Sequence, residues 1–157
     1  MKIILFKENQ KFNQKWLWII LFLAAITPIL ILILDEGFKL DTTNFVLISM
    51  MLLPLFLIYF TELRVEISRE SLKYQFYPFH LKVYEIKHDE IETYDQITYS
   101  PLKDYGGWGI NHTVKGSAYN ISGNKGVKMI LKNGKKILFG SQKAKEFYEA
   151  LNQTTEQ

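Results

Sequence analysis

Three histidines are the side chains best suited to chemistry, and their spacing matches no catalytic or metal-binding motif. His80, His88 and His112 form neither H-x-x-x-H nor H-E-x-x-H, in which two imidazoles on one helix face share a zinc ion. His88-Asp89-Glu90 brings an imidazole beside two carboxylates, which could be metal ligands. An ordinary acidic turn next to a histidine has the same sequence pattern. We therefore predict no metal site and no cofactor.

Hydrolytic and phosphate chemistry have no better support. A serine hydrolase needs a G-x-S-x-G elbow, which the chain lacks. Glu90 and Glu92 would lie on the same face of a strand, as a pair of catalytic carboxylates would. A solvated sheet edge explains this pair more simply. The glycine-rich stretch 101–126 matches neither G-x-x-x-x-G-K-[ST] nor G-x-G-x-x-G, so glycine turns are the simpler interpretation. We predict that the protein is not an enzyme.

Two features remain as candidate binding or interface sites. Trp108 stands between glycines, and we expect it to fill the core; an exposed anchoring role is the alternative. A lysine-rich segment facing anionic lipid would gain about 1 kcal/mol per lysine, whereas a solvated lysine face is the simpler interpretation. The candidate residues are Trp108, Lys125, Lys128, Lys132, Lys135 and Lys136.

Two uninterrupted apolar runs precede all of these residues. Run 16–34 would extend about 28 Å as a helix, close to the ~30 Å hydrocarbon thickness of a bilayer. A cleaved signal peptide would be shorter and would be followed by a small-residue cleavage site, which is absent here. The prediction is a transmembrane hairpin over 16–61, with helices at about 16–34 and 43–61 and a short external loop at 35–42.

The charges that flank the hairpin predict its orientation. Lysines prevail in the N-terminal segment 1–15, basic residues follow the second run, and acids dominate the loop between the runs. Because lysine and arginine favour the cytoplasmic side, we expect a multi-pass protein of the cell membrane with both termini cytoplasmic. The net charge of +3 and the absence of cysteine predict neither nucleic-acid binding nor a disulfide framework.

The remaining residues, 62–157, predict a cytoplasmic domain that begins with strands. Leu63, Val65 and Ile67 alternate with polar residues, as in a strand with one buried face. Asn133-Gly134 between two apolar runs predicts a hairpin with a two-residue type I′ turn. The expected strands are 62–68, 72–77, 81–86, 91–99, 127–132 and 135–139.

The end of the chain changes to helical periodicity. Ala144, Phe147, Tyr148 and Leu151 follow at the spacing of one helix face, and Ser141 is a suitable N-cap. A bent sheet covered by one helix would bury both apolar faces. The predicted class is an α+β membrane protein, a transmembrane hairpin followed by a pleckstrin-homology-like (PH-like) antiparallel β-barrel or sandwich with one C-terminal helix.

The Gly-Trp-Gly-Ile block at 106–110 and the segments 116–127 and 131–143 resemble a group of small, uncharacterised bacterial membrane proteins. These proteins carry one or two N-terminal spans and a PH-like domain, and the resemblance covers mainly 61–152. The family often has a basic residue after the isoleucine, where this chain has Asn111. The resemblance implies a fold and a membrane setting, and it brings no reaction.

These observations predict a noncatalytic integral membrane protein that presents a PH-like domain at the cytoplasmic face of the membrane. The expected partners are the lipid bilayer and either another protein or a second copy of the chain. The alternative is an anionic-lipid sensor that uses the lysine-rich face.

Overall fold

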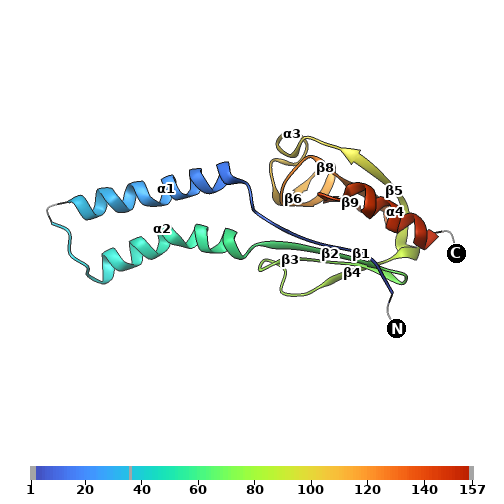
Figure 1. The fold of residues 1–157 in the computed structure, drawn as a ribbon, viewed down its shortest axis with the longest axis horizontal. Helices are drawn as coiled ribbons and strands as arrows, with labels where there is room; N and C mark the ends of the chain where they lie inside the picture. The colour runs from blue at the N-terminus through green and yellow to red at the C-terminus, as the bar shows by residue number, and fades with distance from the viewer. Residues whose placement is uncertain (1–2, 36, 156–157) are drawn as a thin grey trace. The chain divides into compact units, whose positions relative to one another are not determined.

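The computed structural model describes residues 3–35 and 37–155, which fold into two compact units (Figure 1). One unit is the segment Phe12–Thr61. The other joins Met1–Lys11 to Glu62–Gln157, so the first unit is an insertion between two strands of the second. We call them the helical unit and the β unit.

The helical unit contains α1 (Lys15–Leu34) and α2 (Thr42–Phe60), within one residue of the predicted helices. Both are long and apolar enough to cross a bilayer. Among the described residues of the two helices, Ala25 alone is buried. Apolar side chains therefore cover the surfaces of both helices on all sides.

Polar groups within these helices are satisfied locally. The hydroxyls of Thr27 and Ser49 donate to the carbonyls four residues earlier, at 2.7 and 2.8 Å. Asp41 caps α2 by accepting the amide N–H of Asn44 at 2.9 Å. Such internal pairing is what a helix in hydrocarbon requires, because no water is present to bond free polar groups.

The first sheet of the β unit, sheet A, is antiparallel in the order β1-β2-β3-β4. Strands β2 and β3 agree with the prediction to within one residue, and β4 is shorter than predicted. Alternate residues of β2 and β3, among them Leu63, Val65, Leu72 and Phe76, are buried on one face. The strands are β1 (Ile4–Lys11), β2 (Glu62–Ser68), β3 (Ser71–Tyr77) and β4 (Tyr84–Lys87).

Strand β1 corrects the prediction for segment 1–15, which we expected to lie outside the domain. It pairs with β2 from Ile4 opposite Ser68 to Lys11 opposite Glu62, with a register shift between Ile4 and Phe6. Its inward-facing residues are Phe6, Glu8 and Gln10, all buried. Two of these three are polar, so the strand lacks the apolar alternation by which strands are recognised in a sequence.

The second sheet, sheet B, has the order β5-β8-β9-β7-β6. Its pairings are antiparallel except that between β7 and β9, which is parallel. The two sheets do not close into a barrel, so the barrel option of the prediction is wrong. The strands are β5 (Ile91–Thr98), β6 (Gly109–Thr113), β7 (Gly116–Asn120), β8 (Lys125–Leu131) and β9 (Lys136–Gly140).

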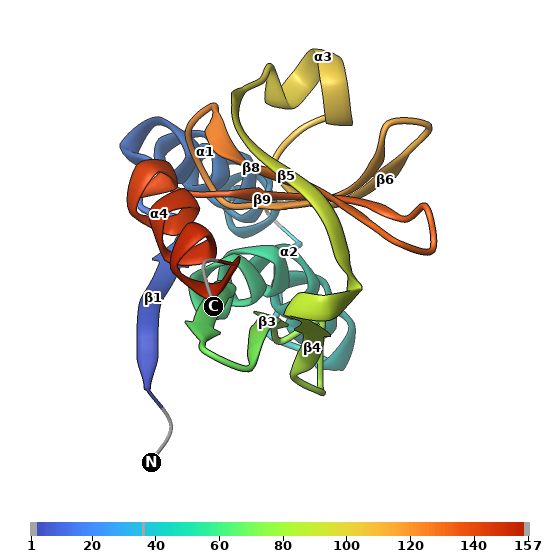
Figure 2. The same cartoon turned by 90° about the vertical axis from the view of Figure 1, so that its right-hand side faces the viewer.

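Three short or terminal helices complete the β unit: η1 (His88–Glu90), α3 (Pro101–Tyr105) and α4 (Ala144–Thr155). Helix α4 lies beside β1 (Figure 2), and the Phe6 and Phe147 rings stack with centroids 5.1 Å apart. Tyr74 of sheet A meets Tyr119 and Phe139 of sheet B at 5.0 and 4.9 Å. Aromatic rings from both sheets and the C-terminal helix thus form one core.

The turn between β8 and β9 differs from the predicted type I′ turn. That turn requires positive φ at both central residues, but Gly134 has φ +79° and no described non-glycine residue has positive φ. Ile130 pairs with Lys136, and the Gly134 N–H donates to Leu131 O at 2.8 Å. The connection is therefore a three-residue loop, 132–134, with glycine in the left-handed position.

The glycine-rich stretch contains more regular structure than predicted, namely α3, β6 and β7. Five of its glycines do have positive φ, as expected for glycine turns. Gly126 is different, because a Cβ there would lie 2.3 Å from the carbonyl oxygen of Phe139 on the neighbouring strand. The missing side chain at Gly126 allows β8 and β9 to lie close together.

Candidate functional site

The β unit has two ends, which the strand register defines. At the connection end, β1 finishes at Lys11 and β2 begins at Glu62, and Glu62 also pairs with Tyr77 of β3. Only Thr61 separates β2 from α2. At the far end, Ser68 and Ser71 flank the turn between β2 and β3.

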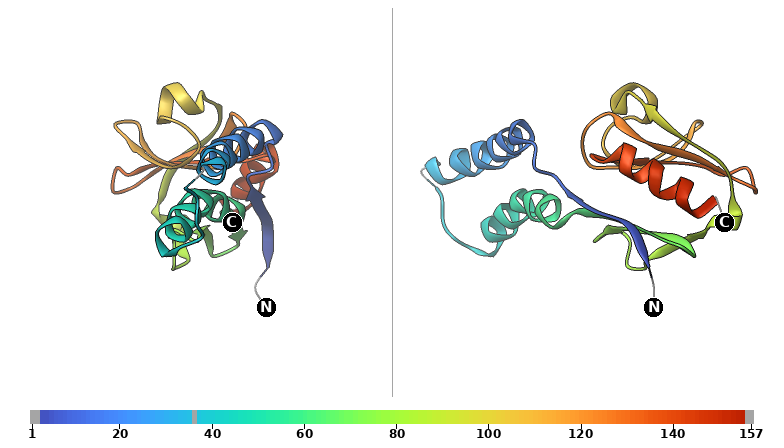
Figure 3. Two further views of the ribbon diagram at one scale, coloured as in Figure 1. Left: turned by 90° about the vertical axis from the view of Figure 1, so that its left-hand side faces the viewer. Right: turned by 45° about the vertical axis from the view of Figure 1, so that its right-hand side comes forward.

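The predicted lysine cluster is divided between these ends. His88 Nε2 donates to Ser68 O at 2.8 Å, and the Lys132 N–H donates to Glu90 O at 2.9 Å, which fixes the β8–β9 turn at the far end. Figure 3, right, shows this turn beside the segment that joins β4 to β5. Of the candidates, Lys132, Lys135 and Lys136 belong to this turn region.

The other two lysines lie elsewhere on β8. Lys125 is at the opposite end of the strand, where its carbonyl accepts the Ser141 N–H at 3.0 Å. Lys128 lies mid-strand directly opposite Asp95 of β5, so an acid faces it across the sheet. The five lysines therefore do not form one continuous cationic patch.

Trp108 is half-buried, between the two alternatives of the prediction. Its indole N–H donates to the carbonyl of Gly123 at 3.2 Å, which joins the stretch after α3 to the loop before β8. The nearby Asn111 amide donates to Gly107 O at 3.0 Å. Asn111 is thus a neutral side chain that is bonded within the glycine-rich segment.

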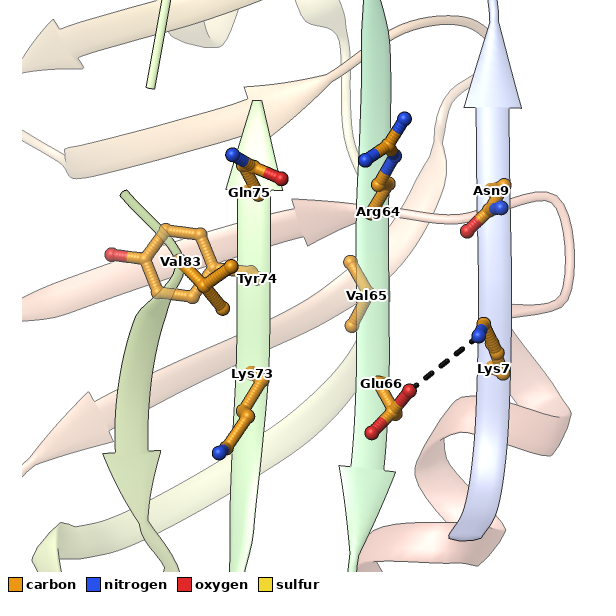
Figure 4. Close-up of a pocket in the computed structure, with 9 residues that line it drawn as sticks. All are labelled: Lys7, Asn9, Arg64, Val65, Glu66, Lys73, Tyr74, Gln75 and Val83. Carbon is orange, nitrogen blue, oxygen red and sulfur yellow. Dashed lines mark ion pairs between the residues drawn. The ribbon is translucent and has the colours of Figure 1, made fainter. Parts of the chain in front are cut away.

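A shallow hollow of about 400 Å³ lies on the outer face of sheet A (Figure 4). Its lining comes from three strands, β1, β2 and β3, and from the loop before β4. Most of its side chains are polar or charged, and the hollow is open to solvent. The lining residues are Lys7, Asn9, Arg64, Val65, Glu66, Lys73, Tyr74, Gln75 and Val83.

Charges on this outer face alternate in sign from strand to strand. Lys7 Nζ lies 3.6 Å from Glu66 Oε2, Glu66 is opposite Lys73, and Lys73 Nζ lies 3.4 Å from Glu85 Oε1. Such exposed pairs contribute little to stability, on the order of 0–1 kcal/mol each. These side chains can exchange their ion-pair partners for charges on another protein surface, so the outer face is suited to binding. The same side chains do not form a nucleophile with an adjacent base.

Arg64 is an outer-face cation of β2, two residues from Glu62 at the connection end. It donates to Glu62 Oε2 at 3.1 Å, and its guanidinium lies 5.6 Å from the Tyr77 ring centroid. The hydrogen bond to Glu62 raises the pKa of the Arg64 guanidinium, against the opposing effect of its partial desolvation. The side chain therefore stays cationic and lines the hollow.

His80 and His112 interact electrostatically, whereas His88 lies at the far end of the β unit. His80 lies against the rings of Tyr74, Tyr84 and Tyr119, and burial lowers its pKa, with a further lowering from His112. Over residues 3–35 and 37–155 the structure places no three His, Cys, Asp or Glu side chains close enough to hold a metal ion. His88 serves the far-end contact described above.

The loop 78–83 between β3 and β4 was not expected from the sequence. We expected Leu81 and Val83 to begin a strand, but β4 starts only at Tyr84. Phe79, Leu81 and Val83 are instead exposed, Leu81 to 88%. A proline at the end of β3 beside alternating apolar residues is the one sequence signal that marks this loop.

Comparison of the chain with protein-family models, with curated proteins and with solved structures found no match.

Proposed function

We propose that this chain is a noncatalytic integral membrane protein that holds a PH-like β unit at the cytoplasmic face of the cell membrane for binding to another protein or to itself. The observation that carries the proposal is the exposure of α1 and α2. Both are apolar and of spanning length, and neither packs into a protein core.

The energetics of the helices support insertion. Each leucine, isoleucine or phenylalanine contributes about −0.3 to −0.6 kcal/mol at the centre of a spanning helix. In water the same side chains would stay exposed, including Ile31 at 68% and Phe45 at 63%. A soluble helical hairpin would bury one face of each helix, and a signal sequence would not explain the second helix.

The β unit follows the helices too closely for an independent tether. One residue separates α2 from β2, and three separate β1 from α1. Three residues reach about 10 Å at most, so the connection end stays near the membrane surface. Basic residues on both sides of the hairpin and acids in its loop favour the cytoplasmic side for this unit.

The outer face of sheet A is the surface we assign to a protein partner. It combines the hollow with rows of alternating charge, which favour a complementary protein surface over a uniformly anionic membrane. The alternative function, an anionic-lipid sensor, would need a continuous lysine-rich face. The division of the lysines between the two ends does not provide one. We therefore expect the partner to present a surface of mixed charge.

The absence of cysteine allows a direct test. A photocrosslinker attached to Asn9→Cys, on the outer face, should give an adduct in native membranes. The same reagent on Gln153→Cys, exposed on α4, is the matched control. If only uncrosslinked monomer is recovered with the crosslinker at either position, partner binding at this face is contradicted. Release of the chain from membranes by alkaline carbonate would contradict membrane insertion.

A further inference from the structure

The loop between β3 and β4 presents its apolar side chains to the outside. Phe79 is 59% exposed, Leu81 88% and Val83 57%. Lys82, between the last two, is also exposed. An isolated exposed apolar residue is common, but three at alternate positions of one loop form a local patch that calls for a partner.

Hydrogen bonds from His80 fix the shape of this loop. The His80 N–H donates to Phe76 O at 2.7 Å, and the Phe76 N–H donates to His80 Nδ1 at 3.2 Å. The Gln75 side chain donates to His80 O at 3.0 Å. Because His80 is directed inward, its neighbours Phe79 and Leu81 are held outward before any partner binds.

The strand register places the loop at the connection end of the β unit. Tyr77, the last residue of β3, pairs with Glu62, the first residue of β2. Glu62 follows α2 after a single residue. The loop therefore begins beside the point at which the chain arrives from the proposed spanning helix.

We infer that the loop 78–83 is a second membrane contact, which inserts Phe79 and Leu81 into the interfacial region of the bilayer that the hairpin spans. This inference rests on the proposed membrane insertion. Apolar side chains next to the exposed Lys82 suit that region, where rings and aliphatic chains enter the acyl boundary and cations meet phosphates. The contact would restrict the orientation of the β unit at the membrane.

The test uses the full chain in vesicles of phosphatidylcholine and phosphatidylglycerol. An environment-sensitive fluorophore on Lys82→Cys keeps both apolar residues, and the same fluorophore on Asn133→Cys at the far end is the control. The Lys82 probe should emit at shorter wavelength and be quenched by a nitroxide placed near the lipid headgroup. The Asn133 probe should show neither effect.

A second variant separates lipid contact from other causes. Phe79→Ser with Leu81→Ser, both at exposed positions, should abolish the quenching at Lys82 while the core remains folded by near-ultraviolet circular dichroism. Carbonate-resistant flotation of the same vesicles reports hairpin insertion independently. Flotation with a water-like Lys82 probe would overturn the loop contact alone. A shielded but unquenched probe would indicate protein contact and also overturn it. Loss of flotation would overturn the proposed function itself.

Discussion

Glu8 joins the N-terminal strand to the start of the C-terminal helix, and its removal should destabilise the β unit strongly. Its side chain is buried and accepts the Ser141 hydroxyl at 2.6 Å and the Gln142 N–H at 2.9 Å. Ser141 in turn accepts the Lys143 N–H at 2.9 Å, just before α4. Glu8 thus acts as a cap supplied by a distant strand.

The magnitude follows from the two hydrogen bonds. Each bond to a charged acceptor is worth roughly 1.5–3 kcal/mol, and Glu8→Ala leaves both donors without it. We expect a loss of about 3–5 kcal/mol in the free energy of unfolding. At about 4 °C per kcal/mol, the melting temperature falls by roughly 12–20 °C. Glu8→Gln keeps one acceptor and should lose about 1–2 kcal/mol.

The assay is thermal unfolding of the detergent-solubilised chain, followed by near-ultraviolet circular dichroism of the core tyrosines. Lys7→Ala is the control, because Lys7 belongs to the same strand but its side chain is 60% exposed on the outer face. That variant should stay within about 0.5 kcal/mol of the parent. Equal stability of Glu8→Ala and Lys7→Ala would refute the inward docking of β1.

Three further predictions follow from local geometry. Gly126→Ala should cost about 1–3 kcal/mol in unfolding free energy, because its Cβ would lie 2.3 Å from Phe139 O; unchanged urea unfolding would contradict this contact. The lowered pKa of His80 predicts stability that is complete above about pH 6.5 and falls as the pH drops toward the folded-state pKa, since protonation ends acceptance of the Phe76 N–H. The slope of melting temperature against pH between 5 and 7 should decrease in His80→Phe. Trp108→Phe should lose one hydrogen bond, about 0.5–1.5 kcal/mol by urea unfolding, and a larger loss would indicate a core role.

The features predicted well from sequence are those with a strong local period. The two apolar runs, the alternation of Leu63, Val65 and Ile67, and the helical spacing around Phe147 each place one element within a few residues. The helix start was less accurate: Ser141 was expected to cap it, but α4 begins at Ala144. Ser141 instead bonds Glu8, a partner that no local pattern reveals.

The candidate sites depended on long-range arrangement and were predicted less well. Consecutive lysines along β8, the turn and β9 looked like one cluster in the sequence. The strand is long enough to place Lys125 and Lys132 at opposite ends of the β unit. The register between strands decides which residues lie on the same face or at the same end of a sheet. The spacing of residues along the chain does not reveal that register.

The sequence by itself determined the two apolar helices, most strands of the β unit and its C-terminal helix, because side-chain periodicity reflects burial one residue at a time. Only the tertiary structure decided that β1 completes sheet A, that β7 runs parallel to β9 and that the loop with Phe79 and Leu81 lies at the connection end. Each of these depends on pairing between distant segments. Glu8 and Gln10 show why: these polar side chains face the core, where the Glu8 carboxylate accepts the Ser141 hydroxyl and the Gln10 amide N–H donates to Gly140 O.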